Sequence, residues 1–203
     1  MTDDTHDRLG RRELLRGAGA MALLPLLSAC GERLEPLPSP WRSGSRLDAM
    51  IPASSAYLDV VNAHTNERVA LQFAQDGRMG DRALRRLDWL FRDWRQGRDP
   101  EIDRRVYWGL AALSDQARIQ GHSGQLTLLS GYRTRRTNNM LRTRGSGAAS
   151  NSYHLRRRAA DIRFNGIEPG QVAEWAEWMQ IGGVGRYGNF THVDSGPIRG
   201  WRG

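Results

Sequence analysis

Three absences limit what this chain can be. The sequence has a single cysteine, no lysine, and no apolar run of the roughly 20 residues that cross a bilayer as a helix. With only Cys30 available, an intramolecular disulfide is excluded. The apolar run over 18–27 is too short to be a membrane span. Because lysine is absent, the positive charge comes from arginine, and the formal net charge is +8.

The N-terminal 30 residues have the pattern of a bacterial export signal. Arg11 and Arg12 form a twin-arginine pair, an apolar stretch follows, and Leu-Ser-Ala stands before Cys30. That tetrapeptide resembles a lipobox, in which the cysteine is lipidated and becomes the first mature residue; the alternative is an ordinary signal peptide with an incidental cysteine. We expect a periplasmic protein exported by the twin-arginine route and anchored to a membrane by lipid on Cys30. Gly31 occupies the position at which aspartate retains lipoproteins in the inner membrane, which favours the outer membrane.

The rest of the chain divides into a tether and one domain. Residues 31–55 contain several prolines with serine and glycine, a composition typical of an extended tether. Residues 56–203 are enough for one domain with its own core. The positive charge reflects either a genome rich in arginine codons or attraction to anionic polymers, which outside the cytoplasm are cell wall and lipid headgroups. We find no base-reading motif and expect no nucleic-acid partner.

The apolar periodicity of the domain predicts helices first and strands later. Helices are expected from Asp81, from Pro100 and over 171–180, and strands over 57–62, 68–73, 125–129, 159–164 and 190–194. The first two strands flank a short polar turn and read as a hairpin. This order favours an α+β fold, a single small domain with a central antiparallel sheet flanked by helices.

Two imidazoles and a carboxylate form a complete protein ligand set for a catalytic zinc, which keeps its fourth position open. His154, Asp161 and His192 provide such a set. His154 and Asp161 are seven residues apart, too far for one helical turn, so a loop must fold back onto its own strand. His192 and Asp194 lie two apart on one strand and point to the same face. The three ligands converge if the strands of Asp161 and His192 are neighbours; otherwise the histidines are ordinary surface or core residues.

Several motifs follow one another in an order that resembles a known peptidase superfamily. They are Ser-Gly-Tyr-Arg at 130–133, Ser-Tyr-His at 152–154, Ala-x-Asp at 159–161, Gly-Val-Gly-x-Tyr at 183–187, His-Val-Asp at 192–194 and Gly-Pro-x-Arg-x-Trp at 196–201. The chain resembles the zinc peptidases that include D-Ala-D-Ala carboxypeptidases, lysostaphin-type enzymes and the hedgehog domain, and most closely the MepK-like murein endopeptidases.

The resemblance implies a fold, a reaction and site residues. It implies a hedgehog/D-Ala-D-Ala-peptidase-like domain that binds one zinc ion through His154, Asp161 and His192. It also implies hydrolysis of peptide crosslinks in peptidoglycan, with Arg133 holding a substrate carbonyl or carboxylate. A fixed guanidinium suits the oxyanion that forms during amide hydrolysis.

Two positions depart from the pattern of the wider family. Arg157 stands where the family has glycine, so either the bend there is strained or the loop is shaped differently. Asn189 stands where many carboxypeptidase relatives have a general-base glutamate, and an amide cannot accept a proton at working pH. Asp194 is either the replacement base or a partner that orients a ligand histidine. Two alternative functions follow: a carboxypeptidase that trims terminal D-Ala, and a non-catalytic zinc-containing module that binds peptidoglycan.

Overall fold

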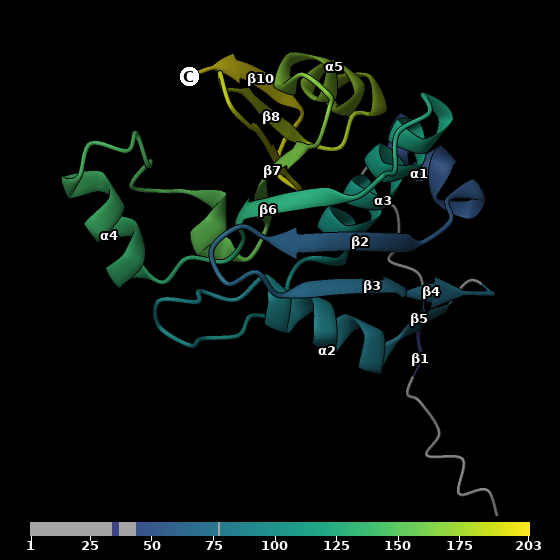
Figure 1. Ribbon diagram of the computed structural model, residues 1–203, viewed down its shortest axis with the longest axis horizontal. Helices are drawn as coiled ribbons and strands as arrows, with labels where there is room; N and C mark the ends of the chain where they lie inside the picture. The colour runs from purple at the N-terminus through teal and green to yellow at the C-terminus, as the bar shows by residue number, and fades with distance from the viewer. Residues whose placement is uncertain (1–33, 37–43, 77) are drawn as a thin grey trace, which may run out of the picture. The chain divides into compact units, whose positions relative to one another are not determined.

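A seven-stranded mixed sheet organises the fold (Figure 1). The computed structural model describes residues 34–36, 44–76 and 78–203, all of them within one compact unit. The expected export signal and the expected lipidation site Cys30 lie outside the described residues. Among the residues described, no helix has the length and apolar character to cross a membrane.

The strands of the large sheet lie in the order β10-β8-β9-β7-β6-β2-β3. Their bounds are β2 Tyr57–Asn62, β3 Arg68–Gln72, β6 Leu126–Ser130, β7 Ala159–Phe164, β8 Gly183–Arg186, β9 Thr191–Asp194 and β10 Arg199–Arg202. A small second sheet contains β1 Leu34–Pro36, β4 Ala74–Gln75 and β5 Arg78–Gly80, in the order β1-β5-β4.

The α+β class is confirmed, but the prediction of an antiparallel sheet is wrong. β2 pairs with β6 in parallel, and so does β10 with β8, while the other pairs of the large sheet are antiparallel. The β2–β6 pair is parallel because the chain leaves the β2–β3 hairpin, passes through the two helices over 81–90 and 104–119, and returns as β6 beside β2. A connection of that length is what parallel neighbours need.

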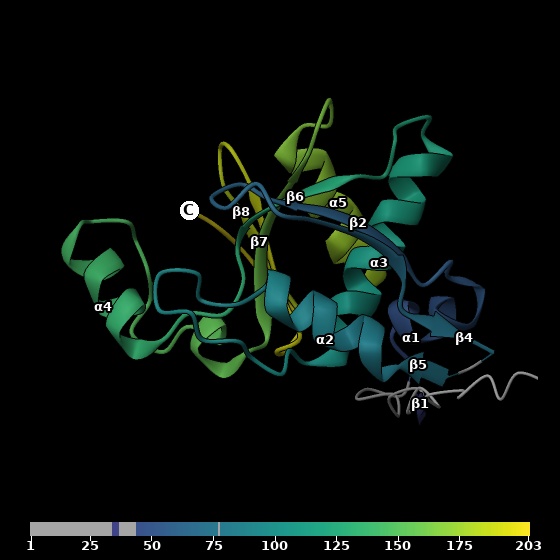
Figure 2. The ribbon, with the colours of Figure 1, turned by 60° about the horizontal axis from the view of Figure 1, so that its bottom comes forward.

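The helices are α1 Arg46–Met50, α2 Asp81–Leu90, α3 Arg104–Ile119, α4 Arg135–Thr143 and α5 Pro169–Met179, with 3₁₀ turns η1 Ile51–Ala53 and η2 Tyr153–Arg156. α3 contacts α5 and β2, and α5 also packs on β7, β8 and β9. Both helices bury apolar residues such as Leu110 and Ala176 against the sheet. α4 stands apart from the other helices, beyond the end of β6 (Figures 1 and 2).

The expected helix start at Pro100 is wrong by one turn. α3 begins at Arg104, where the side chain of Asp103 accepts the backbone N–H of Arg105 at 3.0 Å and so caps the helix. The preceding Ile102 is held outside the helix because its N–H donates to the buried carboxylate of Asp88 at 2.9 Å.

Part of the expected tether over 31–55 is packed instead. α1 buries Leu47 completely, and its Asp48 forms an ion pair with the buried Arg105 of α3. A buried guanidinium needs such a partner, so this pair fixes α1 against the core. Residues 37–43 lie outside the described part of the chain.

Candidate metal centre

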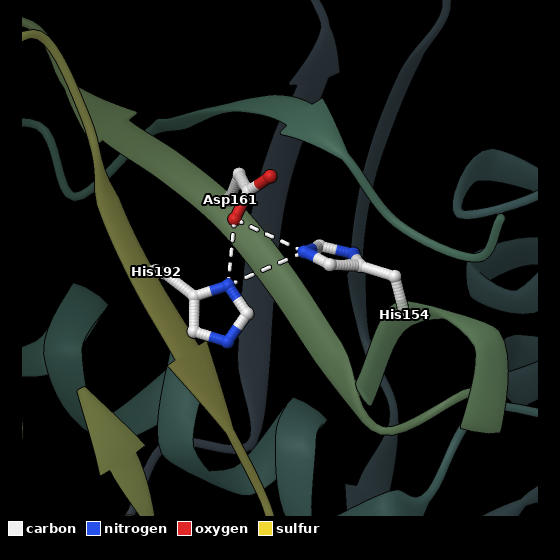
Figure 3. Close-up of side chains that lie close together, drawn as sticks. All are labelled: His154, Asp161 and His192. Atoms are coloured by element: carbon white, nitrogen blue, oxygen red, sulfur yellow. Dashed lines mark hydrogen bonds and ion pairs between the residues drawn. The ribbon is translucent and has the colours of Figure 1, made fainter. Parts of the chain in front are cut away.

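The three predicted ligands come together on the sheet (Figure 3). Asp161 of β7 lies directly opposite His192 of β9 in the antiparallel register. His154 comes from η2, the turn that precedes β7, and points at the same spot. All three side chains are buried, with 2 to 8% of each residue exposed. The condition that their strands be neighbours is met.

A left-handed turn carries the chain from His154 into β7. Ser152 caps η2 by accepting the backbone N–H of His154 at 3.3 Å, and η2 ends at Arg157 with φ +61° and ψ +33°. Arg157 therefore adopts the positive φ for which glycine is suited. Of the two alternatives raised by the sequence, this geometry favours the strained bend, because arginine occupies a conformation that disfavours a side chain.

Gly131 holds the other side of His154. A β-bulge between Leu128 and Ser130 turns the chain out of β6, and the carbonyl of Gly131 then accepts Nδ1–H of His154 at 2.6 Å. A Cβ on Gly131 would lie 2.4 Å from the carbonyl oxygen of Phe91, so only glycine allows the two backbones to approach this closely. This bond fixes the tautomer of His154 and leaves its Nε2 with a free lone pair.

The second histidine is oriented in the same way. Nε2 of His192 lies 3.1 Å from the carboxylate of Asp194 and donates to it, so Nδ1 faces Asp161 and His154. The remaining oxygen of Asp161, Oδ2, accepts from Arg133 at 2.5 Å. Each ligand thus has one atom committed to a neighbour and a second nitrogen or oxygen atom directed to the centre.

The three donor atoms fit a divalent metal ion. His154 Nε2 lies 3.1 Å from Asp161 Oδ1 and 3.2 Å from His192 Nδ1, and the last two atoms are 2.8 Å apart. Tetrahedral zinc with bonds of about 2.0–2.1 Å places its ligand atoms roughly 3.3 Å apart, close to these separations. Two nitrogens with one oxygen are a donor set that suits zinc.

Burial and neighbouring charge set the protonation of the triad. Burial lowers the pKa of His154 and keeps its ring neutral. Burial also opposes charge on His192, but its hydrogen bonds to Asp161 and Asp194 outweigh this and raise its pKa to about 9. Burial raises the pKa of Asp161, yet the two histidines hold it well below its ordinary value. At neutral pH the His192 ring of the metal-free site is therefore positively charged. Its additional proton is on Nδ1, and a metal ion must displace it.

We expect zinc affinity to depend on pH accordingly. Below about pH 9 the proton on His192 competes with the metal, so the apparent affinity should fall about tenfold for each pH unit between 8.5 and 6.5. Competition with a chelator of known affinity measures this slope. Calorimetry in buffers of different ionisation enthalpy should show about one proton released per zinc bound. An affinity that stays constant over this range would contradict the protonation of His192.

Asp194 is fully occupied by partners. One oxygen accepts the backbone N–H groups of Gly183 at 3.2 Å and Gly196 at 2.7 Å, and both oxygens are bonded by Arg199 at 3.1 and 2.6 Å. The other oxygen, Oδ2, also accepts Nε2–H of His192 at 3.1 Å. Burial raises the pKa of Asp194, but His192 and Arg199 outweigh it and hold it far below its usual range. A completely buried carboxylate with this set of donors is suited to orient His192 and poorly suited to take up a proton.

Of the remaining residues singled out by sequence, Asn189 lies away from the triad and Arg133 lies beside it. Asn189 is exposed in the turn between β8 and β9 and does not line the cleft at the metal centre. Arg133 does line that cleft, and its Nε donates to Ser130 at 2.8 Å while another nitrogen holds Asp161. The guanidinium is thereby fixed beside a metal ligand.

A cleft of about 560 Å³ opens over the triad, a volume within the range of small-ligand sites. Its aromatic wall consists of Tyr153, Tyr187, Phe190 and Trp201. Tyr187 stacks on Phe190 with 4.3 Å between ring centroids, and its hydroxyl accepts Nε1–H of Trp201 at 3.1 Å. The opposite wall is the loop over 146–152.

Arg199 is the site residue that sequence reasoning overlooked. It was visible only as a member of the Gly-Pro-x-Arg-x-Trp motif at 196–201, with no role attached. In the structure its guanidinium donates hydrogen bonds to both oxygens of Asp194. The guanidinium carbon lies 4.8 Å from the ring centroid of Tyr153 and 4.9 Å from that of Trp201. It links the aromatic wall to the carboxylate that orients His192.

Comparison with known proteins gives a consistent result. The family model described as peptidoglycan L,D-endopeptidase MepK matches residues 51–201. The chain is 37% identical over 150 residues to the peptidoglycan L,D-endopeptidase MepK of Escherichia coli K12, covering 71% of this chain and 79% of that protein. It is 34% identical over 144 residues to the probable peptidoglycan L,D-endopeptidase MepK of Haemophilus influenzae, covering 70% and 76%. No solved structure matches the chain significantly. The matched region contains all three converging ligands, and the chain belongs to the MepK family of peptidoglycan L,D-endopeptidases.

Proposed function

We propose that this protein is a zinc-dependent murein endopeptidase that hydrolyses peptide crosslinks of peptidoglycan. The observation that carries the proposal is the convergence of three potential ligand atoms, from His154, Asp161 and His192, in a cleft large enough for a peptide. The named activity of the MepK relatives supports the choice of substrate.

The triad, Arg133 and the aromatic wall have separate roles in the proposed reaction. A zinc ion held by the triad would supply an activated water and polarise the scissile carbonyl. Arg133, fixed by Ser130 and Asp161, presents its guanidinium to the cleft, where it stabilises the negative charge that develops on the carbonyl oxygen. The aromatic wall excludes water from one side of the peptide and orients it.

Asp194 serves in this proposal as a positioning residue for His192. Asp194→Asn keeps the shape of the side chain and removes its charge. We expect zinc affinity to fall about 10- to 100-fold, with turnover of the zinc-saturated variant within about tenfold of the wild type. A general base would instead cost about 10²- to 10⁴-fold in kcat even at saturating zinc. Asp99→Asn, an exposed carboxylate outside the cleft, is the matched control, and both constants are measured on all three proteins.

Product analysis tests the reaction itself. Incubated with purified crosslinked muropeptides, the zinc-loaded protein should convert dimers to monomers, which chromatography and mass spectrometry distinguish. Release of free D-alanine without loss of dimers would assign the carboxypeptidase activity instead. Binding to sacculi with no soluble product would favour the non-catalytic module.

We further propose that the protein works outside the cytoplasm as a lipoprotein. The support is the twin-arginine pair, the short apolar stretch and the lipobox-like sequence that ends at Cys30. A lipid anchor on Cys30 would place the peptidase domain beside the murein layer, and Gly31 points to the outer membrane.

A further inference from the structure

One wall of the cleft belongs to a segment with no negative charge. The sequence has no aspartate or glutamate between Asp115 and Asp161. Within that interval, residues 133–152 form the end of the Ser-Gly-Tyr-Arg motif, α4 and the loop beside the triad. We call this segment the cationic arm, because its charged residues are all arginine: Arg133, Arg135, Arg136, Arg142 and Arg144.

The cationic arm is hydrogen-bonded to the loop over 91–103, between α2 and α3, and this loop contains Arg95. The buried carboxylate of Asp93 accepts both the backbone N–H and the hydroxyl of Thr134 at 2.8 Å, and it also accepts the N–H of Arg95 at 3.2 Å. The Arg95 guanidinium lies over the ring of Trp94 at 4.2 Å, and that ring stacks on His64. This loop thus presents an arginine whose guanidinium is supported by stacked rings, and its backbone lies beside α4 (Figure 2).

Arg95 lies within electrostatic reach of the arm. Partial burial lowers its pKa, and the positive charges of Arg133 and Arg144 lower it further despite the opposing effect of Asp93. Within the described ranges, the exposed Arg95 and Arg144 have no carboxylate at ion-pair distance, whereas the buried Arg105 and the partly buried Arg186 do. Like charges gathered without counter-charges are unfavourable unless an anion binds among them.

Arg133 connects this cluster to the metal centre. It lines the main cleft with His154, and it also lines a small recess together with Trp94 and Arg95. Arg133 is therefore shared by the cleft over the triad and by the recess at Arg95, so a substrate that extends from the triad over Arg133 approaches Arg95. A bidentate guanidinium is the group best suited to bind a carboxylate on that path.

We propose that Arg95 and Arg144, with the cationic arm, form a subsite that binds a free carboxylate of the peptide substrate away from the bond that is cleaved. This inference rests on the proposed function, because it assigns the acidic part of the same substrate to a surface. A membrane surface is the less favoured partner, since Arg133 makes the cluster continuous with the cleft.

The test uses the zinc-loaded full-length protein and a matched pair of double variants. Arg95→Gln with Arg144→Gln should raise KM for crosslinked muropeptides about tenfold or more, and kcat should change much less. Arg78→Gln with Arg86→Gln removes the same charge from exposed positions elsewhere and should leave KM unchanged. Arg95→Lys with Arg144→Lys retains the charge and should recover part of the loss.

Chemical amidation of the substrate identifies the group that is recognised. The wild type should lose affinity for amidated muropeptides by a similar factor, and the Gln double variant should lose little more. Equal KM values for both Gln double variants, or equal losses on amidation, would overturn the subsite. So would an effect of the Arg95 and Arg144 changes on binding to anionic vesicles alone.

A binding measurement separates this inference from the proposed function. An uncrosslinked stem peptide offers carboxylates but no crosslink to cut, and isothermal titration calorimetry measures its binding to each variant. If this binding depends on Arg95 and Arg144 while no protein cleaves crosslinks, the subsite stands and the endopeptidase proposal fails. If crosslinks are cleaved but the stem peptide binds equally to all variants, the endopeptidase proposal stands and the subsite fails.

Discussion

Replacing His154 by alanine is expected to abolish measurable crosslink cleavage, with a loss of about 10³-fold or more. The variant removes the Nε2 ligand and also the Nδ1–H that donates to Gly131 at 2.6 Å. A metal ion contributes several kcal/mol to transition-state stabilisation, and about 1.4 kcal/mol corresponds to each factor of ten in rate. The zinc content of the purified variant should fall in parallel with its activity.

The matched control for this variant is His122→Ala. His122 is a partly exposed histidine that does not belong to the converging group, so its replacement should leave both zinc content and activity near the wild-type values. Thermal unfolding of both variants establishes that they remain folded. Full activity in a folded His154→Ala protein would rule out the assigned ligand set.

Replacing Arg133 by alanine is expected to lower kcat about 10²- to 10³-fold, the usual cost of removing one oxyanion donor. Lysine at this position should restore little, because one ammonium group cannot hold Ser130 and Asp161 and also reach the substrate. Arg86→Ala, exposed on α2, is the control for the loss of positive charge.

Zinc titration distinguishes two ways in which Arg133 can act. If Arg133 only positioned Asp161, excess zinc would restore the activity of the alanine variant. We expect the loss to persist at saturating zinc, because the guanidinium also lines the cleft where the oxyanion forms. Recovery to within about threefold would assign Arg133 a positioning role alone.

The convergence of the three candidate ligands was predictable from sequence because local patterns place its parts. The strand over 159–164 has the bounds of β7, and alternation along 190–194 puts His192 and Asp194 on one face. The resemblance then supplied what spacing left open, namely that these two strands are neighbours. The state of Asp194 was not predictable, because its donors Gly183, Gly196 and Arg199 depend on the tertiary fold.

The missed elements lack a local signal. α4 consists mostly of arginine, threonine and asparagine and has no apolar stripe, so periodicity cannot detect it. β8 is glycine-rich and β10 is short; β8 becomes a strand by pairing with β9 and β10, and β10 by pairing with β8. The parallel pairing of β2 with β6 joins segments more than 60 residues apart, which a hairpin-based reading of successive strands does not anticipate.

The most direct test of the account is the metal dependence of crosslink cleavage. Purified protein is stripped with a chelator, dialysed and assayed on dimeric muropeptides by mass spectrometry before and after addition of one equivalent of zinc. The account predicts no monomer from the stripped protein and full recovery at one zinc per chain, with no recovery for His154→Ala. Undiminished conversion of dimers by stripped protein that contains no metal would contradict it.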